Sequence, residues 1–225
     1  METHSPEARF YNESYKQQNY FRYSTWLYAA YISKLVEFCG LRDGDSLLDV
    51  GCGQGMFSYL FRKHNLEVRG IDISETGVRT AVNLYGKFGV AFAVEDIYTA
   101  TYRKPFDCVF VRSCSLYNTD AFPLRRDITQ NLLRLLKEGG TLIFMYNSNF
   151  SSKKSPTWRY HSLGDVKEHF SNWPEVQMFF MNKFTSFLVR KYSFSKSITR
   201  LNVLLSSALG IGGEIVCVLK KPLSR

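Results

Sequence analysis

The chain has 225 residues, of which 45% are hydrophobic, 16% aromatic and 22% charged. This length suits one domain with its own core, and the composition excludes a disordered protein, a collagen-like repeat and a disulfide-rich secreted module. The formal net charge of +9 points toward nucleic acid or membrane, but residues 183–225 alone hold eight basic residues and one acid. The basic surface is therefore local, because the rest of the chain is close to neutral.

The cysteines and the N-terminus indicate the compartment. Five cysteines are scattered, odd in number and free of any metal-ligand spacing, which predicts free thiols and no metal site. The first residues are polar and do not form a signal peptide, and no apolar run approaches the roughly 20 residues of a membrane span. We expect a soluble, cytoplasmic protein.

An aromatic segment comes first along the chain. Residues 10–31 hold nine aromatic side chains, six of them tyrosine. Tyr11, Tyr15, Tyr20 and Trp26 recur at intervals of four to six residues, which is compatible with one helical face. The same segment ends in an amphipathic helical pattern over Trp26–Phe38, closed by Gly40.

Short apolar runs then alternate with helical patterns. We expect strands at Ser46–Val50, Glu67–Ile71, Val90–Val94, Asp107–Val111 and Thr141–Tyr146. The helices between them are expected at Met56–His64, Glu75–Tyr85 and Asp127–Lys137, the last closed by Gly139-Gly140. This alternation predicts an α/β fold with a parallel sheet covered by helices on both faces.

The C-terminal part departs from this alternation. Leu163–Phe170 has a helical pattern opened by a Ser162 cap, with Asp165 three residues later. Val176–Met181 and Glu214–Leu219 have strand patterns, separated by a basic, serine-rich, partly helical segment over residues 183–209. We expect these two strands to pair antiparallel at one edge of the sheet.

The chemical signal lies where the first strand ends. Gly51, Gly53 and Gly55 alternate between an apolar strand and a helical pattern. Such glycines let the backbone turn sharply and approach a ligand closely, and the carboxyl end of a strand is the usual ligand crevice of an open α/β sheet. Asp72 ends the next strand, where an acid can accept hydrogen bonds from both ribose hydroxyls. Asp96 ends the third strand, where it suits an adenine amino group.

Two nucleotide-binding motifs compete with this interpretation. The dinucleotide fingerprint GxGxxG needs a small sixth residue, but Met56 stands there. Asp49, just before the glycines, fits poorly beside a pyrophosphate and well near a cation. The phosphate-binding string GxxxxGK[ST] does not occur in the chain. The pattern favours a cationic, adenosine-bearing ligand without phosphates.

Residues 45–147 resemble the class I S-adenosylmethionine-dependent methyltransferases. The family pattern D/E-x-G-x-G-x-G is matched by Asp49 and the three glycines, and its acid after the second strand by Asp72 with Ile73. Asp96-Ile97 matches the adenine-contacting pair, residues 106–111 the fourth strand, and residues 136–142 the L-K-x-G-G-x-L turn. The resemblance implies S-adenosylmethionine as cofactor, S-adenosylhomocysteine as product, and a Rossmann-like, doubly wound, mostly parallel seven-stranded sheet.

The resemblance also implies an organisation for the whole chain. We expect a single methyltransferase domain over residues 1–225, with an N-terminal helical lid at 10–40, a cofactor-binding core at 45–147 and an acceptor side at 148–225. Further cofactor contacts are predicted for four residues: Cys52, Arg112, Tyr15 and Tyr20. Aromatic faces of the lid would attract a sulfonium by cation–π interaction, and Arg22 could hold the methionine carboxylate. The alternative is a helix that simply packs on the sheet.

The acceptor is indicated chiefly by missing motifs. The chain has no [DN]PP[YF] after the fourth strand, no Pro-Cys, and no glutamate between Asp96 and Asp127, which favours a small-molecule or saccharide acceptor. His161 could serve as general base near neutral pH; the alternative is an exposed histidine before a helix cap. Tyr117 and Tyr146 could orient an acceptor hydroxyl or form a pocket wall.

The predicted function is methyl transfer from S-adenosylmethionine to an oxygen or nitrogen of a small metabolite, saccharide or natural-product intermediate. Two alternatives stay open: an RNA methyltransferase that uses the basic C-terminal segment, and a non-catalytic S-adenosylmethionine-binding protein. The near-neutral body disfavours nucleic acid. The basic stretch Lys183–Arg200 could bind an anionic acceptor or lipid headgroups, or be a solvated face. The sequence leaves the oligomeric state open.

Overall fold

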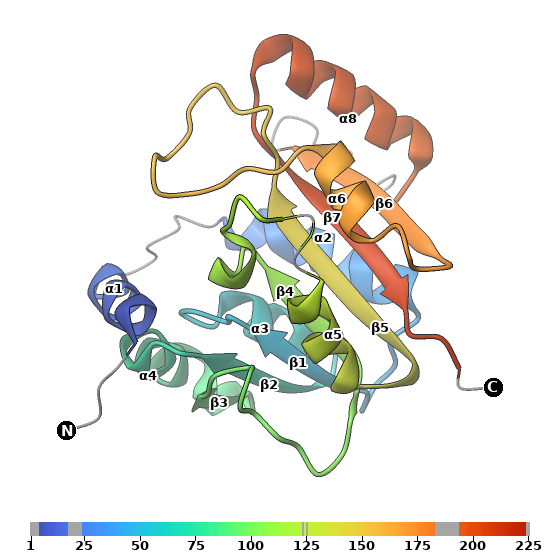
Figure 1. The fold of residues 1–225 in the computed structure, drawn as a ribbon. Helices are drawn as coiled ribbons and strands as arrows, with labels where there is room; N and C mark the ends of the chain where they lie inside the picture. Colours follow the sequence, from blue (N-terminus) through green and yellow to red (C-terminus); the bar gives the residue numbers. More distant parts are fainter. Residues whose placement is uncertain (1–4, 18–23, 123, 125, 183–193, 224–225) are drawn as a thin grey trace. The chain divides into compact units, whose positions relative to one another are not determined.

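A computed structural model describes residues 5–17, 24–122, 124, 126–182 and 194–223 (Figure 1). Seven strands form one sheet in the order β3-β2-β1-β4-β5-β7-β6. The chain divides into two compact units, Met1–Phe110 and Val111–Arg225. The expected α/β class with a seven-stranded sheet is confirmed, and the expectation of a single domain stays a prediction.

The first unit builds the start of the sheet. Its elements are α1 (Pro6–Ser14), α2 (Thr25–Cys39), β1 (Ser46–Val50), α3 (Met56–Arg62), β2 (Glu67–Asp72), α4 (Glu75–Tyr85), η1 (Gly86–Phe88), β3 (Ala91–Val94) and the greater part of β4 (Phe106–Arg112). β1, β2 and β3 are parallel, with Val50 opposite Ile71 and Asp72 opposite Val94. These registers bring the carboxyl ends of the three strands to one edge.

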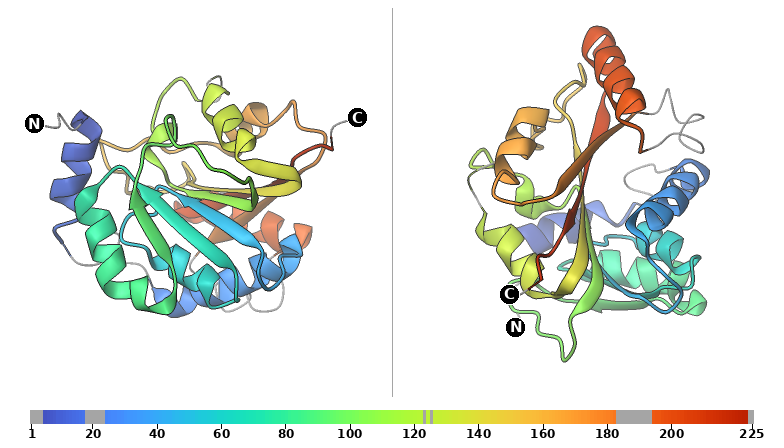
Figure 2. Two further views of the ribbon diagram at one scale, coloured as in Figure 1. Left: turned by 90° about the horizontal axis from the view of Figure 1, so that it is seen from below. Right: turned by 90° about the vertical axis from the view of Figure 1, so that its right-hand side faces the viewer.

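Apolar side chains explain how this unit packs. Leu47 and Leu48 of β1 are fully buried, and so is Phe61 of α3. α3 packs on β2, and α4 packs on β2 and β3. α2 contacts α3, and α1 lies beside α4, as Figures 1 and 2 show. Gly40, in the left-handed conformation with φ 68°, ends α2 as the sequence predicts.

The second unit contains η2 (Ser115–Tyr117), α5 (Asp127–Arg134), β5 (Leu136–Asn147), α6 (Leu163–His169), β6 (Val176–Asn182), α8 (Lys196–Leu209) and β7 (Gly213–Lys220). β7 runs antiparallel to both β5 and β6. The predicted antiparallel pairing of the two late strands is therefore confirmed. Ser162 and Asp165 form the predicted cap of α6, each side chain accepting a hydrogen bond from the other residue's backbone N–H.

The predicted helix over Asp127–Lys137 is too long. It ends at Arg134, and β5 already begins at Leu136. The backbone N–H of Gly139 donates to the Lys221 carbonyl, and the Lys221 N–H donates to the Gly140 carbonyl. The two glycines thus belong to a strand and do not cap the helix. The leucine run fits both periodicities, and pairing with the distant C-terminal segment decides between them.

The single helical face expected over residues 11–26 is also wrong. α1 ends at Ser14 and α2 begins at Thr25, so Tyr11 and Trp26 lie on separate helices. Trp26 is 64% exposed. Tyr20 and Arg22 lie outside the described residues.

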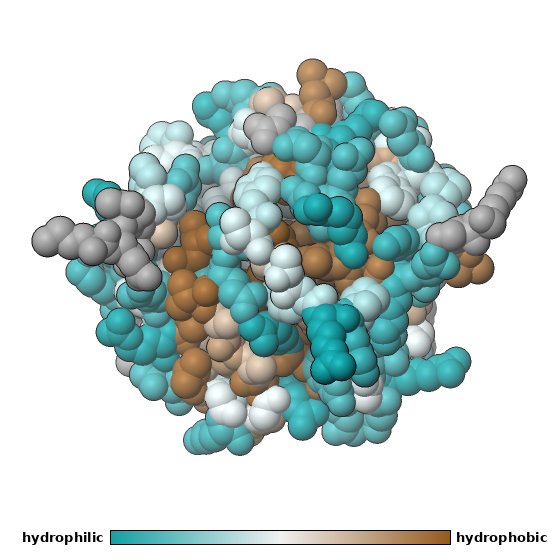
Figure 3. All heavy atoms as spheres, turned by 60° about the horizontal axis from the view of Figure 1, so that its bottom comes forward, coloured by the Kyte–Doolittle hydropathy of each residue, from teal (hydrophilic) through white to brown (hydrophobic). Residues whose placement is uncertain are grey.

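Hydrophilic residues cover most of the face in Figure 3, with apolar side chains visible between them. In the part of the chain that the structure describes, no helix is both long and apolar enough to cross a bilayer. The exposed apolar residues include Val82 and Leu84 of α4.

Candidate functional site

The loop after β1 is held against the end of β2. Gly51, Gly53 and Gly55 have φ values of 72°, 53° and 82°, a region that strains residues with a Cβ. The backbone N–H groups of Gly51 and Cys52 both donate to the Ile71 carbonyl at 2.9 Å. The glycine spacing read from the sequence therefore corresponds to three left-handed positions in a closely bound loop.

Asp72 joins this loop to the start of α4. Its Oδ2 accepts the Gly53 N–H at 2.8 Å and its Oδ1 accepts the Ser74 N–H at 2.9 Å. Asp72 is 6% exposed, and burial raises its pKa to about 6, against the lowering effect of these backbone donors. The backbone N–H of Ile73 also lowers this pKa, and a carboxylate offers about four acceptor positions in all. This arrangement suits a ligand that presents two hydroxyl donors.

Asp49 and Cys52 define the charge of the loop. Asp49 is buried at the end of β1 and accepts a hydrogen bond of 2.5 Å from the Ser58 hydroxyl. Burial, followed by the carboxylates of Asp49 and Asp72, raises the pKa of the Cys52 thiol well above its usual value. The thiol therefore stays protonated and is a poor nucleophile. The carboxylates of Asp49 and Asp72 give this loop a negative charge, which favours a cationic ligand.

The end of β3 adds the third predicted acid. The Glu95 N–H donates to the Asp72 carbonyl at 3.1 Å, which places Asp96 at the same edge as Asp72. Asp96 is exposed, and its Oδ1 accepts the Tyr98 N–H at 2.9 Å. Ile97 is buried and Ile73 is half-buried. The structure thus brings together the residues predicted for ribose and adenine.

Tyr15 reaches the glycine loop from the N-terminal segment. It follows α1, and it is 5% exposed. Its hydroxyl lies 2.9 Å from the position that a Cβ of Gly53 would take, and its ring carbon Cδ2 lies 2.8 Å from that of Gly77. The Tyr11 ring stacks on Tyr15 with centroids 5.7 Å apart. A side chain at either glycine would displace the tyrosine.

In the second unit, Arg112 forms an ion pair with Glu214, and both side chains are 7% exposed. Sequence reasoning missed Glu214, which counted only as one acid in a basic tail. Ser113 follows with φ 43°, and its N–H donates to the Met145 carbonyl at 2.9 Å. Within the described part of the chain, the buried Ser113 hydroxyl has no hydrogen-bond partner. The cofactor role predicted for Arg112 stays a prediction.

His161 lies inside an aromatic cluster and is 4% exposed, so the alternative of an exposed histidine is wrong. Its ring stacks on Phe122 and Tyr146, with centroids 4.1 Å and 4.7 Å away. Nε2 lies 2.8 Å from the Tyr117 carbonyl, which can only accept, so this nitrogen carries the proton. Burial lowers the pKa of His161. The ring is therefore neutral near pH 7, with Nδ1 as the nitrogen able to accept a proton.

The two predicted tyrosines belong to the same cluster. The Tyr117 hydroxyl lies 3.0 Å from the Thr129 hydroxyl, which lies 2.7 Å from Nε2 of His169. The Tyr146 ring stacks between His161 and Trp158. The structure thus brings the three predicted catalytic residues together, in a setting where packing also accounts for them. Their roles stay predictions.

The basic segment is described only in part. Lys196 and Arg200 are exposed on α8, whereas Lys183, Arg190 and Lys191 lie outside the described residues. Among the described residues, no cluster of three or more His, Cys, Asp or Glu side chains could hold a metal ion.

A family model described as a methyltransferase domain matches residues 41–199. The chain belongs to this methyltransferase family. The matched range contains the glycine loop, the acids after β2 and β3, and the aromatic cluster around His161.

Relatives match about half of this methyltransferase chain. Phosphoethanolamine N-methyltransferase 1 of Zea mays is 30% identical over 144 residues, which are 59% of this chain and 28% of that protein. A ubiquinone biosynthesis O-methyltransferase of Coxiella burnetii is 31% identical over 113 residues, which are 48% of this chain and 47% of that protein. The chain spans about half or less of the length of these two relatives.

Solved structures share the fold. Phosphoethanolamine N-methyltransferase 2 of Haemonchus contortus, in complex with phosphomonomethylethanolamine and S-adenosylhomocysteine, has a TM-score of 0.60 at 18% identity, over 86% of this chain and 52% of that one. The [4+2]-cyclase SpnF has a TM-score of 0.58 at 18% identity, over 87% and 82%. The Rossmann-like fold expected from the sequence is therefore confirmed.

Proposed function

We propose that the chain binds S-adenosylmethionine and transfers its methyl group to an oxygen or nitrogen of a small metabolite, with S-adenosylhomocysteine as product. The observation that carries this proposal is the Asp72 carboxylate, buried at the end of β2 and oriented by the N–H groups of Gly53 and Ser74. Membership of the methyltransferase family supports it.

The residues of the first unit fit this cofactor. Asp72 offers two acceptors to the ribose hydroxyls, and Asp96 offers a carboxylate to the adenine amino group. Gly51 lets the backbone approach the ligand closely, and Ile73 supplies an apolar surface for the adenine. The cofactor itself would supply a methyl group activated by a sulfonium, whose positive charge suits the acids Asp49 and Asp72.

The acceptor is proposed to be small. The named relatives act on phosphoethanolamine and in ubiquinone biosynthesis, which supports a metabolite in preference to nucleic acid. On the acceptor side, His161 would accept a proton at Nδ1. Tyr117 and Tyr146 would orient the acceptor hydroxyl or line the acceptor pocket. The rival is a protein that binds the cofactor without transferring its methyl group, because a protein named as a [4+2]-cyclase, and not as a methyltransferase, shares this fold.

Asp72 provides the test of cofactor binding. Calorimetry should show S-adenosylmethionine and S-adenosylhomocysteine binding to the wild type. Asp72→Ala should weaken it about 100-fold, since hydrogen bonds to a charged group contribute about 1.5–3 kcal/mol each. Asp43→Asn changes an exposed acid of the same unit and should leave the affinity unchanged. A wild type that binds neither compound would overturn the proposal.

Transfer needs a separate measurement. Wild-type protein with methyl-labelled S-adenosylmethionine and phosphoethanolamine should yield labelled product if the acceptor resembles that of the plant relatives. Cofactor binding without transfer to any of a panel of amines, phenols and saccharides would favour the non-catalytic rival.

We also propose a cytoplasmic location. All five cysteines are free, and four of them are buried within the units described above. Free thiols persist in reducing compartments, where disulfides are rare. Localisation of a tagged full-length chain in its own cells tests this.

A further inference from the structure

Asn12 ties the N-terminal helix to the turn that follows Asp72. Its Oδ1 lies 2.8 Å from the Ser74 hydroxyl and 3.1 Å from the Thr76 backbone N–H. The Thr76 N–H can only donate, so the Asn12 atom is an acceptor. The Ser74 hydroxyl accepts the Gly77 N–H at 3.1 Å and is thereby free to donate its proton to Asn12.

Gln54 makes a second tie, from the glycine loop itself. It stands between Gly53 and Gly55, and its Nε2 donates to the backbone carbonyls of Tyr15 at 3.2 Å and Gln17 at 2.8 Å. Both partners can only accept, so this amide acts as a donor. The segment after α1 is therefore held by the loop that carries the left-handed glycines.

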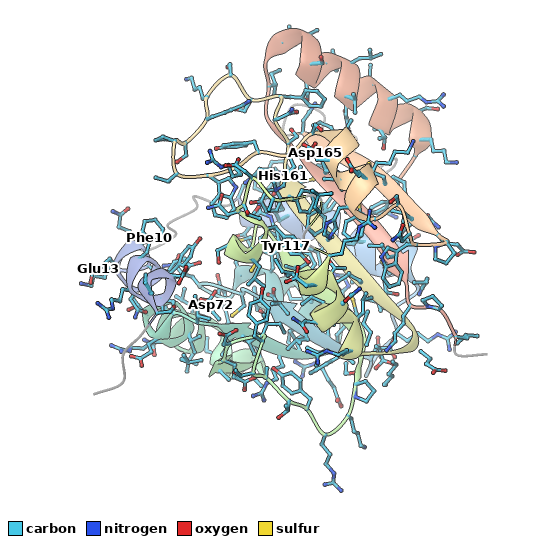
Figure 4. The ribbon with its side chains drawn as sticks, in the orientation of Figure 1. Phe10, Glu13, Asp72, Tyr117, His161 and Asp165 are labelled. Carbon is cyan, nitrogen blue, oxygen red and sulfur yellow. The ribbon has the colours of Figure 1, made fainter. Side chains whose placement is uncertain are left out.

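Tyr15 lies between these two ties. Its ring occupies the space that a side chain at Gly53 or Gly77 would fill. Asn12 holds the helix before Tyr15, and Gln54 holds the backbone at Tyr15 and beyond it. Phe10 and Glu13 lie on the exposed side of α1 (Figure 4). Among the described residues, no hydrogen bond joins either side chain to the glycine loop or to α4.

The docked segment leaves part of the candidate cofactor site accessible, although Asp72 and Gly53 are buried. Gly51, Cys52 and Ile73 are partly exposed with Tyr15 in place, and Asp96 is exposed. The tyrosine thus covers one side of the loop and does not fill the site. An aromatic ring held there is suited to attract a sulfonium.

We propose that Asn12 and Gln54 are positioning residues that latch residues 6–17 onto the glycine loop and thereby set how long the cofactor stays bound. This inference rests on the proposed function, since it assumes that the cofactor occupies this loop. It goes beyond that function by assigning cofactor retention to two amides that are not among the predicted catalytic residues.

Because one amide accepts and the other donates, the same chemical change should have opposite outcomes at the two positions. Asn12→Asp keeps the accepting oxygen and places a negative charge at the N-terminal end of α4, which favours it. Gln54→Glu removes the donor and sets a carboxylate against two carbonyls. Asn12→Leu removes the acceptor. All are measured at pH 8, where Asp72 is ionised, with S-adenosylhomocysteine as the probe.

The expected results are changes in affinity and dissociation rate. Gln54→Glu and Asn12→Leu should each raise the dissociation constant and the dissociation rate about fivefold or more, which corresponds to two lost hydrogen bonds. Asn12→Asp should stay within about twofold of wild type, since both hydrogen bonds persist. Asn83→Asp, the same change at an exposed position of α4, should have no effect and serves as the control.

Hydrogen exchange adds a readout that does not depend on affinity. The Tyr15 N–H donates to the Tyr11 carbonyl at 2.9 Å. S-adenosylhomocysteine should slow exchange over residues 5–17 in the wild type and in Asn12→Asp, but not in Gln54→Glu. Thermal melts identify any variant that has failed to fold. If one of Asn12→Leu and Gln54→Glu fails to fold, the other variant tests the latch.

The outcomes separate this inference from the proposed function. A wild type that does not bind S-adenosylhomocysteine overturns the proposed function. A wild type that binds, with Gln54→Glu and Asn12→Leu binding equally well or more tightly, overturns only the latch. If Asn12→Asp behaves like Asn12→Leu, the accepting role of Asn12 is wrong.

Discussion

The polar groups of residues 46–96 and those of residues 112–169 are fixed in different ways. In the first region, the Asp72 and Asp49 carboxylates accept hydrogen bonds from backbone N–H groups and a serine hydroxyl. In the second, the His161 ring is fixed by stacking on Phe122 and Tyr146 and by one backbone carbonyl. The first region presents acceptors at a strand edge, whereas the second encloses the polar atoms of His161 and Tyr117 among aromatic rings.

This difference decides which functional roles follow from the geometry of each region. Asp72 is a carboxylate at the edge of the sheet, oriented by backbone N–H groups, so its role as an acceptor follows from its own chemistry. His161 already donates through Nε2, so it can act on an acceptor only through Nδ1. Buried aromatic clusters often stabilise the fold without a further role. A base role for His161 would give the second region chemistry of its own, and substitutions at His161 test this role.

The largest effect is expected for His161→Gln. Glutamine keeps a donor for the Tyr117 carbonyl but has no base, so turnover should fall at least about 100-fold if Nδ1 accepts a proton. Calorimetry should show unchanged S-adenosylmethionine affinity. His161→Ala should in addition lower the free energy of unfolding by about 2–4 kcal/mol, because it leaves a cavity between rings.

His169→Gln is the matched control. His169 is buried in the same cluster and bonded to Thr129, but no base role is predicted for it. This variant should lose stability and keep its turnover. If His161→Gln also keeps its turnover, His161 is a packing residue and the two regions differ as sharply as the structure suggests.

Local patterns predicted much of the first region. β1 and α4 have the bounds expected from the sequence, because a short apolar run, a helical pattern and the glycine spacing are local signals. The boundary between α5 and β5 was not predictable in this way. There the leucine run suits either structure, and pairing of Thr141 with Lys220 selects the strand.

The rest of the candidate site depends on contacts that are distant in sequence. Arg112 and Glu214 pair across 102 residues, and Asn12 meets Ser74 across 62. No spacing rule connects such positions in a single sequence. The N-terminal lid was predicted from its aromatic residues; of these, Tyr15 is placed on the glycine loop, whereas Trp26 lies on a separate helix, α2.

A smaller effect is expected from the pH dependence of cofactor binding at Asp72. The pKa of Asp72 is raised to about 6 by burial, and its ionised form accepts the ribose hydroxyls best. As the pH falls through about 6, protonation should weaken S-adenosylmethionine binding by up to about tenfold per pH unit. Calorimetry from pH 8 to pH 5 measures this slope. Asp72→Asn, which cannot titrate, should show none, and a flat wild-type profile would contradict the assignment.

Stability follows the opposite direction at this residue. Because the pKa of Asp72 is raised on folding, its contribution to stability is fully present below the unfolded-state value of 3.8 and is lost as pH rises through about 6. The wild type should therefore gain stability from Asp72 as the pH falls toward 4, while its cofactor affinity declines. Between pH 6 and pH 4, melting temperature should therefore rise while the affinity measured by calorimetry falls. Non-specific acid denaturation would lower both.

The smallest effect is expected at Ser113, which has a left-handed backbone conformation like that of the glycines in the first region. Its φ of 43° lies in the left-handed region and its buried hydroxyl has no partner among the described residues, two costs that often mark functional positions. Ser113→Gly should change the free energy of unfolding by less than about 1 kcal/mol, in the stabilising direction, because strain relief slightly exceeds the entropy cost of glycine. Asn65→Gly, at φ 56°, should be destabilising, since asparagine tolerates this conformation and its amide donates to Asp43 at 3.0 Å. If Ser113→Gly gains stability and loses turnover, its hydroxyl serves the acceptor. If turnover is kept, the strain has no function and the acceptor side rests on stacked rings alone.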